Sequence, residues 1–137
     1  MIRTLSVLAV AGASLLLAAP ASPQTGTTLT IRHQLRGCHS WSVNGGAYKP
    51  SQSISLAKGA TVTIVNNDVM PHKLVKVSGP ALTLPSTSNM NHPGATAKVK
   101  FTKAGVYTLK TRAGEDYMKG IKTIGEDNVL KLTVTVR

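Results

Sequence analysis

The residues best suited to bind a metal lie in two short stretches of the chain. The first, residues 66–72, reads Asn-Asn-Asp-Val-Met-Pro-His and follows a run of β-forming residues. A strand that runs into a tight Asn/Asp turn and then Pro71 holds His72 on a rigid frame, as a metal-binding imidazole requires. The second stretch contains Cys38 and His39, a thiol and an imidazole that favour copper or zinc. The competing interpretations are a His72 that only caps the loop and a Cys38 that is a small buried hydrophobe.

Our preferred site combines donors from three parts of the chain. In it, His72, Cys38 and His39 are joined by Glu115 or Met118, which lie in a later polar loop. A carboxylate ligand favours Cu(II), whereas a thioether favours Cu(I). A regular strand would turn Cys38 and His39 to opposite faces, so we expect both to bind one ion only if they lie in a loop. Glu115 could equally be a hydrogen-bonding partner of a histidine or part of a solvated turn.

Three further residues are weaker candidates for ligands. Met90 and His92 lie in the long polar connection 81–95, and long connections in a small sandwich often carry function. Methionine sulfur binds Cu(I) well, but a methionine in a small protein more often fills a gap in the core. We therefore interpret Met90 and His92 as ligands only in second place, and His33 as a structural residue.

Short strands must position these residues. Stretches rich in Val, Thr, Ile and Leu alternate with polar positions, and turn-forming Gly-containing sequences separate them. Seven or eight such strands in one domain predict an all-β, antiparallel β-sandwich. The expected strands span residues 28–35, 41–43, 53–57, 60–66, 73–77, 96–101, 105–111 and 129–136.

In this order of elements the chain resembles the cupredoxin (plastocyanin/azurin-like) family of copper proteins. In that family the first His ligand follows a strand, an Asn, a turn and a Pro-His pair, as residues 60–72 read here. Residues 104–111 look like the family's penultimate strand, and residues 129–136 look like its closing strand. The resemblance implies a Greek-key β-sandwich of cupredoxin type, a bound copper ion, and electron transfer or copper carriage.

One departure from the family pattern affects the metal site directly. Where the penultimate strand of cupredoxins ends in the Cys ligand, this chain has Thr111, whose hydroxyl is a poor copper ligand compared with thiolate. The loop that follows, residues 112–119, contains no His. The family's usual set of two His, one Cys and a Met is therefore broken here, and the pair of Cys38 and His39 would have to compensate for it.

The N-terminal residues have the pattern of an export signal. Arg3 precedes an apolar run at residues 5–19, and Ala-Pro-Ala at 19–21 resembles a signal-peptidase site. The run is shorter than the ~20 residues that span a bilayer, so we expect no stable membrane span after its removal. We expect a signal peptide and lead-in at 1–24, one cupredoxin-like domain at 25–137, and a periplasmic or secreted protein.

Charge and composition limit the partners. The formal net charge is +11, with 16 Lys and Arg against 5 Asp and Glu. Scattered lysines are typical of a solvated face, and they also favour steering toward an acidic redox or copper-transfer protein. Export and the scarcity of aromatic residues argue against nucleic acid as a partner.

The leading hypothesis is an exported copper-binding protein with an atypical ligand set, and zinc is not excluded. We expect electron transfer or copper carriage and no enzyme activity, because the sequence offers no Ser-His-Asp arrangement and no phosphate-binding loop. Two other classes stay open. One is a metal-free β-sandwich that acts as an interaction module, and the other is an accessory domain of a larger oxidase. The distances among Cys38, His39 and His72 separate these alternatives.

Overall fold

The structure, a computed structural model, describes residues 26–34, 39–114, 119–120 and 129–137. The expected signal peptide at 1–24 lies outside these ranges, as do Cys38, Glu115 and Met118. Within the described ranges, no helix has the length and apolar character needed to cross a membrane.

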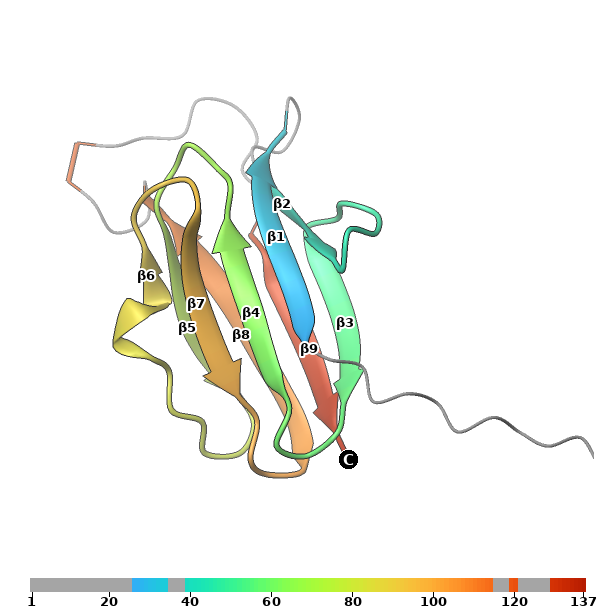
Figure 1. The fold of residues 1–137 in the computed structure, drawn as a ribbon. Helices are drawn as coiled ribbons and strands as arrows, with labels where there is room; N and C mark the ends of the chain where they lie inside the picture. Colours follow the sequence, from blue (N-terminus) through green and yellow to red (C-terminus); the bar gives the residue numbers. More distant parts are fainter. Residues whose placement is uncertain (1–25, 35–38, 115–118, 121–128) are drawn as a thin grey trace, which may run out of the picture.

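The described residues form nine strands in two sheets that pack face to face (Figure 1). The first sheet has the strand order β2-β1-β4-β7, and the second has the order β3-β9-β8-β5-β6. Between β5 and β6 the chain makes a short 3-10 helix, η1 (Ser86–Ser88). The strands are β1 (Thr27–His33), β2 (His39–Val43), β3 (Ser51–Leu56), β4 (Thr61–Asn66), β5 (His72–Ser78), β6 (Asn89–Met90), β7 (Ala95–Lys100), β8 (Gly105–Ala113) and β9 (Lys131–Val136).

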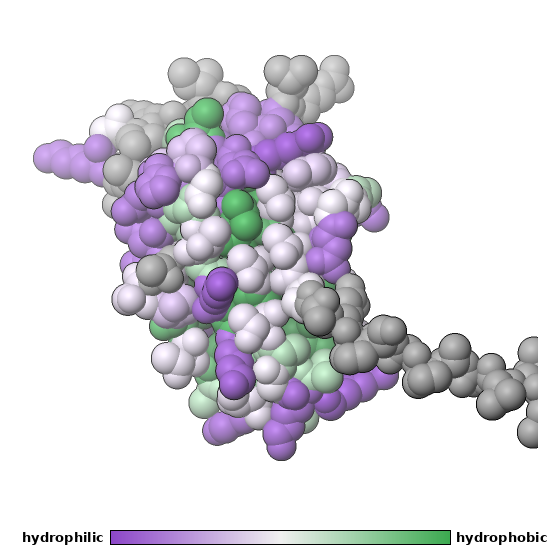
Figure 2. Space-filling model, in the orientation of Figure 1, coloured by the Kyte–Doolittle hydropathy of each residue, from purple (hydrophilic) through white to green (hydrophobic). Residues whose placement is uncertain are grey.

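Strict alternation of side chains builds the core between the sheets. In β4 and β9 every second residue is buried and those between them are partly or fully exposed, as expected for strands with one face on a core. Figure 2 shows the outer side of the first sheet, where polar and pale side chains dominate and apolar areas are small and separate. The core consists of Leu29, Ile31, Trp41, Val62, Ile64, Leu74, Met90, Ala97, Val99, Phe101, Tyr107, Leu109, Leu130, Leu132, Val134 and Val136.

The predicted all-β sandwich is confirmed, and each of the eight expected strands is present with shifts of a few residues at its ends. Strand pairing, however, is mixed, which corrects the antiparallel prediction: β1 and β4 are parallel, and so are β3 and β9. The chain leaves the first sheet after β2, passes through β3 in the second sheet and returns as β4 beside β1. The two-residue strand β6 is an addition that side-chain periodicity could not reveal, because two residues carry no pattern.

Candidate metal centre

A buried asparagine organises the connection between β4 and β5, which crosses from one sheet to the other. The Asn66 side chain donates hydrogen bonds to the carbonyl oxygens of Met70 (3.0 Å) and Met90 (3.1 Å). Its Oδ1 accepts one from the backbone N–H of Asp68 at 2.9 Å. Because Asn66 is fully buried, these three bonds fix the turn against β6 and direct the Asp68 side chain into the end of the sandwich.

The Asp68 carboxylate is fully buried and is the centre of a group of histidines. Its Oδ2 lies 2.6 Å from His39 Nδ1 and 3.1 Å from His72 Nε2. Its Oδ1 accepts a hydrogen bond from the Met70 backbone N–H at 3.0 Å and lies 3.7 Å from His33 Nδ1. We call Asp68, His33, His39 and His72 the Asp68 cluster.

His72 enters the cluster from the first residue of β5. Its ring lies between two oxygens, because Nε2 faces Asp68 while Nδ1 lies 3.1 Å from the Thr111 hydroxyl oxygen on β8. An ionised carboxylate can only accept, so Nε2 carries the proton and donates to Asp68. A neutral imidazole then leaves Nδ1 to accept from the Thr111 hydroxyl, which fixes both the tautomer and the ring orientation.

His39 and His33 enter from the first sheet, on neighbouring strands. They are directly opposite each other in the antiparallel pairing of β1 with β2. His39 is 98% buried, and its ring packs edge-to-face against His72 with the centroids 4.7 Å apart. The His33 side chain is 48% exposed, so this end of the cluster is open to solvent while the other is closed.

Two opposing effects act on the pKa of the Asp68 carboxyl. Burial raises it, because a buried charge loses its hydration. Hydrogen bonds to His39, His72 and the Met70 N–H, together with attraction to His39, outweigh that cost and hold the pKa well below its usual value of 3.8. Asp68 is therefore an anion at neutral pH, which is the form that accepts hydrogen bonds or binds a metal.

This lowered pKa predicts how stability changes with pH. Because the pKa of Asp68 is lower in the folded protein, the unfolded chain binds the Asp68 proton more tightly. The stabilisation that Asp68 gives the folded state is therefore complete above about pH 5. It is lost as the pH falls through 3.8 and below. Urea unfolding of the wild type and of Asp68→Asn at about pH 6 and about pH 3 measures this. We expect the gap in unfolding free energy between the two proteins to narrow at the lower pH. A difference in unfolding free energy that is the same at both pH values would contradict a lowered pKa for Asp68.

Of the residues that the sequence singled out as ligands, the structure brings His39 and His72 together. Cys38, Glu115 and Met118 lie outside the described residues, so their roles stay predictions. Sequence reasoning missed Asp68 as the centre and placed His33 among structural residues. A signal for Asp68 existed, because it lies four residues before His72 in the Asn/Asp turn.

The second candidate pair, Met90 and His92, lies at the end of β6 and just after it. Met90 is directly opposite His72 in the pairing of β5 with β6, but it is fully buried and packs in the hydrophobic core. His92 is exposed, and its Nδ1 donates a hydrogen bond to the Pro93 carbonyl at 3.0 Å. These positions favour the interpretation of Met90 as core filler.

The donors of the Asp68 cluster fit a copper ion held by nitrogen and oxygen. The ligand atoms of His33, His39 and Asp68 all lie within 4.8 Å of one another, and His72 Nε2 contacts the same carboxylate. Imidazole suits copper, and carboxylate is a hard donor that favours Cu(II). Among the described residues, the neighbour of His72 Nδ1 is the Thr111 hydroxyl, which is a poor copper ligand compared with thiolate.

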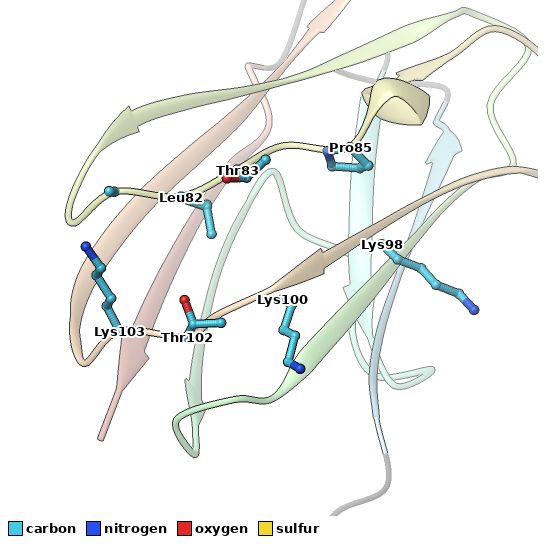
Figure 3. A pocket seen from close by; sticks show the side chains of 8 residues that line it. Leu82, Thr83, Pro85, Lys98, Lys100, Thr102 and Lys103 are labelled. Carbon is cyan, nitrogen blue, oxygen red and sulfur yellow. The ribbon is translucent and has the colours of Figure 1, made fainter.

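A groove of about 490 Å³ lies away from the cluster, between the segment after β5 and the end of β7 (Figure 3). Lys98, Lys100 and Lys103 contribute their side chains to it, and none of the described residues that line it is acidic. Lys100 pairs with Thr61 at the start of β4, five residues before the turn that holds Asp68. At ~3.3 Å per residue, Lys100 is roughly 16 Å along the strand from that turn, and Lys98, which pairs with Thr63, is roughly 10 Å from it.

Comparisons with known proteins agree with this fold. Residues 40–124 match the family model described as copper binding proteins, plastocyanin/azurin family. A search of curated proteins finds no significant match.

Three solved structures illustrate the likeness. Amicyanin from Paracoccus versutus has 16% identity and a TM-score of 0.45 over 84% of each chain. A purple cupredoxin from Nitrosopumilus maritimus has 20% identity and a TM-score of 0.42 over 79% of this chain and 98% of its own. A variant of a multicopper oxidase from Aquifex aeolicus has 15% identity and a TM-score of 0.51, over 85% of this chain and 27% of its own. Its likeness shows the shared fold alone.

Proposed function

Because this chain belongs to the plastocyanin/azurin family of copper binding proteins, we propose that it is an exported copper carrier that binds the ion through His39, Asp68 and His72. The observation that carries this proposal is the convergence of two buried imidazoles on one buried carboxylate oxygen, at 2.6 and 3.1 Å. Bound copper would supply a centre that can exist as Cu(II) or Cu(I). The nitrogen and oxygen donors favour Cu(II), and the family match favours copper over zinc.

Hydrogen bonds within the metal-free Asp68 cluster support copper carriage over electron transfer. Asp68 accepts hydrogen bonds from His39 and His72, and Thr111 donates to the second nitrogen of His72. Release of an ion therefore leaves these buried polar atoms with partners and avoids the cost of unpaired groups. Electron transfer needs a site that suits Cu(I) and Cu(II) almost equally, which a carboxylate ligand does not favour.

An acidic redox or copper-transfer protein is the proposed partner. The net charge of +11 supports steering of an acidic surface toward this protein. The three lysines of the groove offer one place where such a surface could bind. Their distance from the Asp68 cluster favours a role in capture and orientation. We place the protein in the periplasm or outside the cell, in line with the export pattern of residues 1–24.

Titration of the purified mature protein with Cu(II) tests the proposal. Isothermal titration with a glycine competitor gives stoichiometry and affinity, and electron paramagnetic resonance reports the donor atoms. We expect one equivalent of tightly bound Cu(II) with nitrogen hyperfine structure. His72→Gln and His39→Gln should each weaken binding by more than about 10- to 100-fold, which is the loss when only a hydrogen-bonding partner of a ligand is removed.

His92→Gln is the matched control, because it removes an exposed histidine outside the cluster, and it should bind copper as the wild type does. A Cys38→Ser variant, compared by visible absorption, measures any thiolate contribution. Wild-type affinity in both His72→Gln and His39→Gln would overturn the proposed site. Absence of tight copper binding in the wild type would instead favour a metal-free interaction module.

A further inference from the structure

The two oxygens of Asp68 face different surroundings. Oδ2 lies between His39 and His72, whose side chains are 2% and 0% exposed. Oδ1 faces His33, whose side chain is 48% exposed. The carboxylate thus connects a closed inner pair of imidazoles with a third imidazole that reaches solvent.

His33 is positioned beside the inner pair without being bonded into it. Its Nδ1 is 3.7 Å from Asp68 Oδ1, which is too long for a hydrogen bond. Its ring contacts that of His39 edge-on, with centroids 6.2 Å apart and an interplanar angle of 75°. The backbone places it directly opposite His39 at the end of β1. The His33 backbone is therefore held in place by β-pairing, and a small rotation of the side chain brings its ring to the Asp68 carboxylate.

A buried site needs an exposed first ligand if the ion arrives from water. His39, Asp68 and His72 bury their donor atoms almost completely, so an ion that reached them directly would have to shed its water before gaining any protein ligand. His33 offers a first nitrogen at the surface, and the buried Asp68 Oδ1 lies 3.7 Å from it as the next donor. Since the donors of His33, His39 and Asp68 lie within 4.8 Å, His39 can join before His33 leaves.

We propose that His33 is the entry ligand of this protein, a residue that takes Cu(II) from solvent and passes it by way of Asp68 to His39 and His72. The inference rests on the proposed copper site. The exchange transfers the ion from one imidazole to the next with no change in oxidation state. Because the same path serves both directions, an entry ligand speeds uptake and release equally and leaves the equilibrium affinity unchanged.

Stopped-flow kinetics of the full mature chain with Cu(II) test this role. Trp41 is the protein's one tryptophan and lies two residues from His39 on the same face of β2, so its fluorescence should be quenched when copper binds. Uptake is followed after mixing with Cu(II)–glycine, and release is followed after mixing the loaded protein with excess chelator. We expect His33→Gln to slow both rates by about tenfold, within the range over which association rates vary among variants of one site, with an unchanged dissociation constant.

The matched control is His92→Gln, which removes another exposed histidine and should leave both rates at the wild-type value. Uptake by His33→Gln as fast as that of the wild type would overturn the entry role. Weaker binding with faster release would also overturn it, because His33 would then be a retained ligand. Failure of the underlying copper site is recognised separately: the wild type itself would bind no copper at equilibrium, before any variant is compared.

Discussion

Replacing Asp68 with Asn is expected to destabilise the protein by about 2–4 kcal/mol, because the buried His39 and His72 N–H groups lose a shared anionic acceptor. The Asn amide keeps the size of the side chain but offers one oxygen, and its NH₂ group would face N–H donors. Urea unfolding near neutral pH, followed by Trp41 fluorescence, measures the change in free energy. The same substitution should abolish tight Cu(II) binding, since it removes the anionic ligand that contacts both buried histidines.

Asn67→Ala provides the matched control for this effect. Asn67 is exposed in the same turn, and among the described residues its hydrogen bond runs from the backbone N–H to the Ile31 carbonyl. Removal of its side chain should therefore change stability by less than about 0.5 kcal/mol. If Asp68→Asn unfolded at the same urea concentration as the wild type, the Asp68 carboxylate would not be what holds His39 and His72 together. Normal stability with lost copper binding would leave Asp68 as a ligand without a structural role.

Thr111→Cys is expected to create an intense visible absorption band when Cu(II) is added. The variant is made in a Cys38→Ser background, so that it contains only one thiol. The Thr111 hydroxyl lies 3.1 Å from His72 Nδ1, and a cysteine there would place sulfur in the position that the resemblance gives to the family's Cys ligand. Thiolate binds copper far better than a hydroxyl does. The ion should then move from the Asp68 side of His72 to its Nδ1 side, and absorption spectroscopy records the new thiolate-to-copper band.

Thr108→Cys, in the same background, is the control for a thiol anywhere on β8. Residue 108 faces away from the core, whereas 111 faces into it, so this thiol lies on the wrong side of the sheet to meet His72. We expect no intense band from it. An equally intense band in both variants would show that the absorption comes from adventitious thiolate binding. No band in either would mean that the β8 position does not complete a copper site.

Much of the architecture was accessible from the residues alone. Period-two alternation located the eight longer strands, because a half-buried strand must present alternate residues to the core. The same period puts Tyr107, Leu109 and Thr111 on one face of their strand, and all three are buried in β8. The Asn/Asp turn before Pro71 indicated a rigid frame for His72, and the structure places His72 as the first residue of β5, one residue before the expected strand at 73–77.

Parallel pairing and the centre of the candidate site were not accessible in that way. Alternation specifies which face of a strand is buried but not which strand lies beside it or in which direction, so the parallel pairs β1–β4 and β3–β9 were missed. Asp68 and His39 are 29 residues apart in sequence and come from different elements. Only the packing of one sheet on the other decides that their side chains meet.

The sequence by itself therefore determined the class of fold, the family, the loss of the family's cysteine at Thr111 and the frame that holds His72. Tertiary structure decided that His39 and His72 share Asp68, and that His33 lies at the open end of the same cluster. The reason is physical: local residues set periodicity, turns and which face is buried, whereas contacts between donors from separate strands depend on register and sheet packing, which no short stretch of sequence specifies.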